Sequence, residues 1–430
     1  MEEIIIGRDR TDMEKFGRRG LVFIGRHIVG EGEEAHLTNP VLMDVVRPHL
    51  LLVLGKRGGG KSYSAAVIAE EMGRLPPEVS CNLSTLFIDT MGIYWSMKNP
   101  NERDRELLTK WGLKPQGMNC KVFVPKAYVD DYEKAGVAVD GVFTFPCSEI
   151  AAEDWMLSFG FSMIDPHGIL VERAVKETQK KFGGEYSIKD LIDSVAADRK
   201  SEQCVKDAVT NRFLAAEDWG MFEKKGTPVE KLILPGTISI LDVSHYTQIS
   251  EGWSVRGMMI GLLCRKIYEQ RLIARKLEEM ETITSVSKKT IPMVWIIIDE
   301  AHMFIPESGA TPATGPLLTL IRQGRQPGIS LLLITQRPEK LHEDALSQAD
   351  MVLSHMLTSK ADLDALRAVM QTYAMNDIEE YMNSLPKTKG AALMMDDNSE
   401  RIFTLHVRPR LSWHAGGSPS AIKEKGMFDD

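Results

Sequence analysis

The sequence lacks the features that would direct it to a membrane or to an oxidising compartment. No uninterrupted apolar run approaches the roughly 20 residues needed to span a bilayer. The acidic first residues contain no signal-peptide core. The five cysteines are odd in number and form no C-x-x-C pair, so neither a disulfide framework nor a zinc ribbon is indicated. These absences predict a cytoplasmic protein with no membrane partner.

The sequence also lacks an excess of positive charge. There are 52 Lys and Arg residues against 60 Asp and Glu residues, which gives a net charge of −8. A surface that is basic overall is therefore excluded. Any contact with nucleic acid must be local, for example along the lining of a pore.

The length and composition are those of a globular protein with a sizeable core. The chain has 430 residues, of which 43% are apolar, and this length suggests two to three domain-sized units. The changes in pattern along the chain predict a short β-ribbon over 1–48, the first part of an α/β core over 49–98, a mainly helical insertion over 99–234, the second part of the core with a closing hairpin over 235–412, and a flexible tail over 413–430.

One stretch carries the clearest motif. The apolar run 49–54 breaks into glycines and continues as a helical pattern, and Gly55–Ser62 fits G-x-x-x-x-G-K-[ST]. Glycines allow backbone N–H groups to turn inward around phosphates. Lys61 supplies a charge to the β- and γ-phosphates, Ser62 offers a hydroxyl to Mg²⁺, and the helix dipole favours the anion. The motif predicts a site for ATP and Mg²⁺. The predicted nucleotide-binding residues are Gly55, Gly58, Gly59, Gly60, Lys61, Ser62 and Tyr63.

A second motif ends the most apolar run of the chain. The unbroken run 294–298 is typical of a strand buried on both faces, and Asp299 and Glu300 follow it directly. Successive side chains of a strand point in opposite directions, so the two carboxylates can have different roles. We assign Asp299 to the Mg²⁺ shell and Glu300 to the water that attacks the γ-phosphate. For His302, a relay to the γ-phosphate and simple packing are both compatible with the sequence.

Other polar residues also follow predicted strands. Asp89 ends the strand 86–89, where it would face the ligand crevice of a parallel sheet. Gln336 follows the strand 329–335, and its amide is suited to sensing the γ-phosphate. Three arginines could stabilise charge during phosphoryl transfer, and the residues alone do not choose among them. They are Arg322, Arg325 and Arg337.

The remaining spacing narrows the class of ATPase. Asp299–His302 resembles the motif of DEAH-box helicases, but too few residues follow 335 for a second RecA-like domain. No L-S-G-G-Q-like signature of ABC proteins precedes the strand, and small-molecule kinases do not normally place Glu after the Asp. A ring-forming translocase with a RecA-like α/β fold and a mostly parallel sheet remains.

The ordered motifs resemble those of the HerA branch of the HerA/FtsK translocases. The similarity extends over about residues 20–410 and is most specific from 294 to 338. It implies a homohexameric ring that drives double-stranded DNA through a central channel, often with a NurA-like nuclease. It further implies that Lys61, Ser62, Asp299 and Glu300 form the ATPase site, that Arg325 acts in trans, and that Gln336 is the sensor.

Two other functions remain open at this point. The chain could be a pump for viral genome packaging or conjugation, although conjugation pumps usually carry a membrane anchor. It could also be a nucleotide-dependent scaffold that assembles an effector on a ring. The acidic net charge and the lack of a basic tract are compatible with this scaffold.

Overall fold

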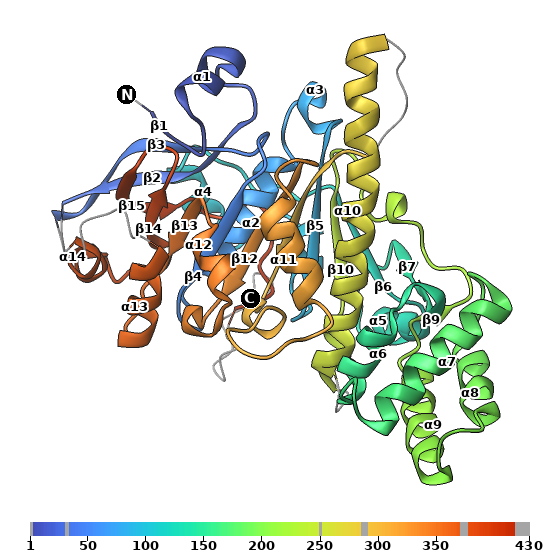
Figure 1. Cartoon of the computed structure of the whole chain (residues 1–430). Helices are drawn as coiled ribbons and strands as arrows, with labels where there is room; N and C mark the ends of the chain where they lie inside the picture. The colour runs from blue at the N-terminus through green and yellow to red at the C-terminus, as the bar shows by residue number, and fades with distance from the viewer. Residues whose placement is uncertain (1–2, 31–33, 249–251, 285–290, 370–376, 418–430) are drawn as a thin grey trace, which may run out of the picture.

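The computed structural model describes residues 3–30, 34–248, 252–284, 291–369 and 377–417. Within these ranges, 13 strands form one sheet, and a short pair of strands lies apart from it (Figure 1). The strands of the large sheet, in spatial order, are β1 (Ile4–Ile6), β3 (His36–Asp44), β2 (Leu21–Val29), β15 (Arg401–Val407), β14 (Ala391–Asp396), β13 (Met351–Ser354), β4 (Leu50–Leu54), β12 (Ile329–Thr335), β11 (Met293–Ile298), β5 (Leu83–Asp89), β10 (Ile238–Asp242), β6 (Cys120–Pro125) and β7 (Gly141–Phe143).

The centre of the sheet is parallel. Strands β13, β4, β12, β11, β5, β10 and β6 all run in one direction. The register places Thr335 opposite Leu54 and Asp242 opposite Asp89. The carboxyl ends of these strands therefore meet along one edge of the sheet, which we call the carboxyl edge. The opposite edge is called the amino edge.

The central strands are buried on both faces, as their unbroken apolar runs predict. In β4, Leu52 and Leu54 belong to one hydrophobic core, whereas Leu51 and Val53 belong to a second core on the other face. This alternation follows from the period of two in a strand. The α/β class with a mostly parallel sheet is confirmed.

Helices cover both faces of the sheet. On one face, α2 (Lys61–Met72) contributes its apolar side to the second core. On the other, α10 (Gly252–Thr284) and α11 (Thr314–Gln323) contribute to the first core. Figure 1 shows α10 extending well beyond the sheet. The other helices are α1 (Arg10–Phe16), α3 (Pro77–Ser80), α4 (Arg105–Lys110), α5 (Val129–Lys134), α12 (Glu343–Ser347), α13 (Lys360–Val369) and α14 (Asp377–Ser384).

The segment predicted as a helical insertion, 99–234, divides into two parts. Its first part adds β6 and β7 to the large sheet because β6 pairs with β10. This first part also holds the short helices α4 and α5, whereas four further helices begin at Ala152 and pack against one another beside α10 (Figure 1). They are α6 (Ala152–Phe159), α7 (Pro166–Phe182), α8 (Ile188–Ala197) and α9 (Gln203–Glu217), and β8 (Phe145–Pro146) pairs with β9 (Phe222–Glu223).

The two ends of the chain meet in the sheet. The predicted N-terminal ribbon is not separate, because β2 pairs with β15 of the closing hairpin. Beyond β15 the chain continues over α2, and Trp413 N donates to Asn99 O at 2.8 Å. The first residues of the predicted flexible tail are therefore hydrogen-bonded in place. The rest of that tail, 418–430, and part of the predicted linker, 285–290, lie outside the described residues.

Candidate active site

The predicted phosphate-binding loop lies between β4 and α2 at the carboxyl edge. Gly55, Gly58 and Gly60 have positive φ angles of 146°, 74° and 107°, which glycine adopts without the steric cost of a side chain. Gly60 is the N-cap of α2 and makes no side-chain hydrogen bond, so the first N–H groups of the helix remain available to an anion. The loop therefore has the backbone geometry and the donors that phosphate binding requires.

Lys61 is folded into this loop. Its Nζ donates to the carbonyl oxygen of Lys56 at 3.0 Å, and the side chain is buried. Burial lowers the pKa of Lys61, and the nearby charges of Asp299 and Glu300 act in the opposite direction. Charges that are removed from water interact more strongly. Lys61 therefore lies where its charge would act strongly on a bound phosphate.

Ser62 and Asp299 form the candidate Mg²⁺ site. Ser62 Oγ donates to Asp299 Oδ2 at 2.9 Å, although 237 residues separate them in the sequence. Mg²⁺ is typically held by one or two carboxylates together with phosphate oxygens and waters. A hydroxyl and a buried carboxylate beside the phosphate loop fit this requirement. Burial raises the pKa of Asp299, while the hydrogen bonds from Ser62 and from the Glu300 backbone oppose the rise.

Glu300 follows β11 in a strained turn. Its φ is 53°, a left-handed conformation that non-glycine residues rarely adopt. Gln336 Nε2 donates to Glu300 Oε1 at 3.0 Å, so the two strand ends join as the sequence predicts. Within the described part of the chain, Glu300 Oε2 accepts no hydrogen bond. Burial and the charge of Asp299 raise the pKa of Glu300, which makes it a stronger base.

His302 contacts the end of the neighbouring strand β12. Its Nδ1 lies 3.0 Å from Thr335 Oγ1 and 3.5 Å from Glu300 Oε2. Burial lowers the pKa of His302, and the charge of Arg337 adds to this effect. His302 is therefore neutral at pH 7 and holds the ends of β11 and β12 together.

Tyr94 belongs to the site and was given no role in the sequence analysis. Its hydroxyl donates to Asp299 Oδ2 at 3.4 Å. Asp89, predicted to face the crevice, instead accepts the backbone N–H groups of residues 91–94 and thereby fixes the turn that carries Tyr94. An Asp followed three residues later by Gly92 is the one local signal of this turn.

The three candidate arginines lie at different places. Arg337 follows β12 at the carboxyl edge and pairs with Glu339 at 3.1 Å. Arg322 and Arg325 lie at the amino edge, and Arg322 pairs with Asp344. Arg325 is exposed, and its guanidinium makes no hydrogen bond or ion pair within the described residues. Strand β12 separates Arg325 from the phosphate loop by about 20 Å, at about 3.3 Å per residue.

Tyr63 faces the outer side of α2, toward the end of the described chain. Its hydroxyl accepts the backbone N–H of Arg410 at 2.6 Å, and its ring meets the ring of His414 edge-on at 5.4 Å between centroids. The same segment is anchored by Glu70, which is fully buried and pairs with Arg408 and Arg410. The C-terminal segment thus packs on the outer side of α2 and holds this helix in place.

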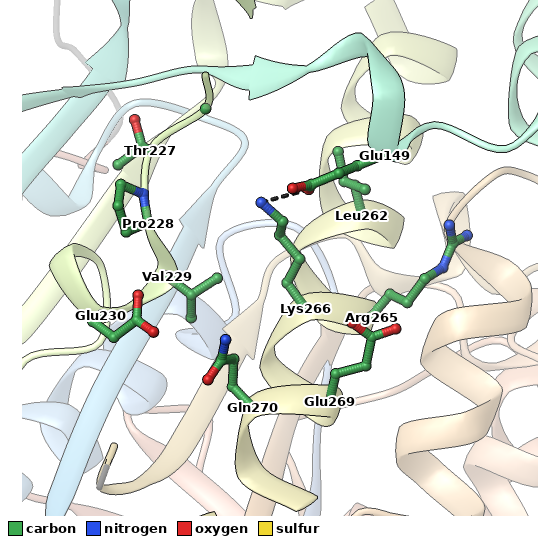
Figure 2. Close-up of a pocket in the computed structure, with 11 residues that line it drawn as sticks. Glu149, Thr227, Pro228, Val229, Glu230, Leu262, Arg265, Lys266, Glu269 and Gln270 are labelled. Atoms are coloured by element: carbon green, nitrogen blue, oxygen red, sulfur yellow. Dashed lines mark ion pairs between the residues drawn. The ribbon is translucent and has the colours of Figure 1, made fainter. Parts of the chain in front are cut away.

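A separate pocket of about 570 Å³ lies between α10 and the segment that precedes β10 (Figure 2). It is lined by side chains of both signs, and the pair between Lys266 and Glu149, 2.5 Å apart, crosses it. The carboxylates of Glu230 and Glu269 also line it. None of the predicted site residues lines this pocket.

The fold and the site together define the class. The strand order β13-β4-β12-β11-β5 places the predicted phosphate loop after β4, Gln336 after its neighbour β12, and Asp299 and Glu300 after β11. This is the arrangement of a P-loop ATPase with a RecA-like core. A family model described as the central domain of the helicase HerA matches residues 22–265, more than half of the chain. The chain belongs to this family.

Named relatives agree with this assignment. The DNA double-strand break repair helicase HerA of Pyrococcus furiosus is 27% identical over 149 residues, which cover 31% of this chain and 26% of the relative. The probable DNA double-strand break repair helicase HerA of Methanocaldococcus jannaschii is 39% identical over 71 residues, 16% of this chain and 14% of the relative. The matched parts thus span about a quarter or less of these relatives.

A solved structure shows the same fold. VirB4 of Thermoanaerobacter pseudethanolicus superposes with a TM-score of 0.50 at 11% identity, covering 90% of this chain and 97% of that one. Among the described residues, no helix is both long and apolar enough to cross a membrane.

Proposed function

We propose that the chain is an ATP-hydrolysing motor that works as a ring and moves or unwinds double-stranded DNA. The observation that carries this proposal is the free carboxylate oxygen of Glu300 beside the Ser62–Asp299 pair, with Gln336 bonded to its other oxygen. A site built only to bind a nucleotide needs no buried base next to the metal ligands. DNA as the substrate is supported by the names of the relatives.

Each residue has a role that its geometry supports. Lys61 and the N–H groups of the loop would hold the phosphates, and Ser62 and Asp299 would hold Mg²⁺. When bound, the ion would supply positive charge that stabilises the transferring phosphoryl group. Glu300 orients the attacking water and takes its proton through Oε2, while Gln336 fixes the carboxylate. Tyr94 orients Asp299.

The missing positive charge is supplied by a neighbouring subunit. Arg325 cannot reach the phosphates of its own chain, since it lies at the opposite edge of the sheet. Its exposed and unpaired guanidinium is suited to the site of an adjacent copy, where such a residue stabilises the transition state. A ring of six copies, and a NurA-like nuclease as partner, are further parts of the proposal that rest on the family resemblance.

The proposal is tested by measuring ATP hydrolysis with and without double-stranded DNA, together with the mass of the assembly in solution. Hydrolysis by an oligomer that DNA stimulates severalfold is the expected result. Lys61→Ala serves as the control for contaminating ATPases, because it removes the phosphate-binding ammonium. Hydrolysis that is indifferent to DNA would support the scaffold instead. A monomer with full activity would contradict the role of Arg325.

A further inference from the structure

His355 lies directly beneath the phosphate loop. It follows β13, and its backbone N–H donates to the carbonyl oxygen of Leu54, at the end of β4, at 2.9 Å. The pairing of the two chains continues into the loop, where Lys56 N lies 3.5 Å from Met356 O. The segment after β13 therefore packs against the phosphate loop and is hydrogen-bonded to it.

The side chain of His355 fills the space next to the glycines of the loop. A Cβ atom placed on Gly55 would lie 2.7 Å from Cβ of His355, and one placed on Gly60 would lie 3.3 Å from its Cε1. The imidazole is 1% exposed. These two glycines are therefore required by the contact with His355 as well as by their backbone angles.

Both ring nitrogens of His355 are hydrogen-bonded, and the partners fix the tautomer. Nδ1 lies 3.0 Å from the carbonyl oxygen of Ala391 in β14, which can only accept. Nδ1 therefore carries the hydrogen, and Nε2 accepts from the hydroxyl of Ser64 at 2.8 Å. Burial lowers the pKa of His355 to about 4, so the neutral ring persists at pH 7.

Ser64 is part of the first turn of α2, two residues after Ser62. Its backbone N–H donates to Gly60 O at 2.8 Å, and its hydroxyl is bonded to His355. The ring thus connects the start of the helix to β14 and supports the glycines between them. A phosphate-binding loop held in its binding conformation has less conformational entropy to lose when the ligand arrives.

We propose that His355 is a positioning residue for the nucleotide: it holds the phosphate loop and the first turn of α2 in the conformation that binds the triphosphate. The inference rests on the proposed role of the P-loop as an ATP site. It adds a residue outside the motif, some 300 positions away in the sequence. His355 acts through its contacts with Gly55, Gly60 and Ser64.

The test compares four full-length variants by their affinity for ATP with Mg²⁺, measured by calorimetry in the absence of DNA. Ser64→Ala removes one hydrogen bond and leaves the ring in place, so we expect the Kd for ATP to rise about three- to tenfold. His355→Asn keeps a donor near Ala391 but removes the ring beneath the glycines, and we expect a rise of about tenfold or more. In steady-state hydrolysis, KM should rise more than kcat falls.

Ser354→Ala is the matched control. Its hydroxyl is also buried, and it donates only to the backbone oxygen of His355 at 3.1 Å. We expect its Kd to equal that of the wild type. The double variant of Ser64 and His355 should bind no more weakly than His355→Asn alone, because both changes remove the same bond.

Two outcomes would overturn the inference. One is an unchanged Kd for ATP in both Ser64→Ala and His355→Asn. The other is a fall in melting temperature that accounts for the whole change in affinity of Ser64→Ala, His355→Asn and the double variant. That result would indicate a purely structural role. Because these measurements omit DNA, they are independent of whether DNA stimulates hydrolysis. A wild-type chain that binds no nucleotide would overturn this inference and the proposed function together.

Discussion

The polar and charged side chains at the two edges of the sheet differ in how far they are buried and held in place. At the carboxyl edge, Lys61, Asp299 and Gln336 are held by hydrogen bonds, and the first two are buried. At the amino edge, Arg322 and Arg325 are exposed. Rigid, poorly hydrated groups favour catalysis, whereas exposed flexible ones are available to another molecule. Under the proposed function, the two edges would be two halves of one hydrolytic site that a single chain cannot bring together.

The largest effect is expected from Arg325→Ala. Removal of an arginine that acts in trans typically costs about 10³- to 10⁵-fold in the rate of phosphoryl transfer, so we expect kcat to fall about 10⁴-fold. The affinity for ATP should change little, because the carboxyl edge is intact. The measurement is steady-state hydrolysis together with ATP binding.

Arg322→Ala is the control from the same edge. Its guanidinium is already paired with Asp344, so its loss should change kcat by less than a few fold. Mixed assemblies of Arg325→Ala and Lys61→Ala subunits should regain activity, since each supplies the half that the other lacks. If Arg322→Ala is the inactive variant, the roles of the two arginines must be exchanged.

The next largest effect concerns the carboxyl edge alone. Glu300→Gln keeps the size of the side chain and its contact with Gln336 but removes the base. We expect hydrolysis to fall about 10³-fold, within the usual range for a lost general base, while ATP with Mg²⁺ still binds. Glu307→Gln, an exposed acid on the following loop, should be silent. Near-normal turnover of Glu300→Gln would exclude Glu300 as the base.

The sequence predicts the carboxyl edge better than the amino edge. Strands β4 and β12 have the bounds that the sequence predicts, because a strand buried on both faces has a nearly continuous apolar run. The pairs Ser62–Asp299 and Glu300–Gln336 follow once these strands are neighbours. Residue spacing alone does not choose among the three arginines, and only the family resemblance points to Arg325. The pairing of Arg322 with Asp344 depends on how α11 packs on α12, which spacing does not show.

Some contacts of the site cannot be predicted from any local sequence pattern. Tyr94 reaches Asp299 because β5 lies beside β11, and His355 reaches Ser64 because β13 lies beside β4. Such proximity depends on strand order, which periodicity does not encode. The tail was predicted to be flexible from its Gly, Ser and Lys content, yet residues up to Ala415 are hydrogen-bonded. Part of this anchoring comes from Glu70, a fully buried helical acid that accepts the backbone N–H groups of Leu411 and Ser412.

The next effect concerns the stability of the fold, which we expect to depend on the buried Glu70. Glu70→Gln leaves the buried Arg410 without its carboxylate partner and leaves Arg408 with Glu71 alone, so we expect a loss of about 3–5 kcal/mol in the free energy of unfolding. Denaturant unfolding at pH 7 measures it. Glu78→Gln, an exposed acid in α3, is the control and should unfold as the wild type does.

The difference in unfolding free energy between wild type and Glu70→Gln should depend on pH. The charges of Arg408 and Arg410 lower the pKa of Glu70 against the opposing effect of burial. A lowered pKa contributes stability above the unfolded value of 4.5, and this stability is lost as the pH falls through the folded value. The gap between wild type and Glu70→Gln should therefore narrow below pH 4.5. A gap that is constant with pH would show that Glu70 contributes by packing and not by its charge.

The smallest expected effect is a shift in the pH profile of hydrolysis. Gln336 donates to the ionised form of Glu300 and so lowers its pKa, whereas burial and Asp299 raise it. Gln336→Met removes the donor and keeps the length of the side chain, so the pKa of Glu300 should rise. Since the base acts as a carboxylate, activity is lost as the pH falls through this pKa, and the acid limb of kcat/KM should move to higher pH.

The profile of kcat/KM is the proper measurement because it reports the free enzyme, in which the hydrogen bond from Gln336 is present. Gln348→Met, which changes an exposed amide at the end of α12, should leave the limb in place. A limb that stays fixed in Gln336→Met, or moves to lower pH, would mean that Gln336 does not tune the base. The pKa of Glu300 would then be set by burial and by the charge of Asp299, without a contribution from Gln336.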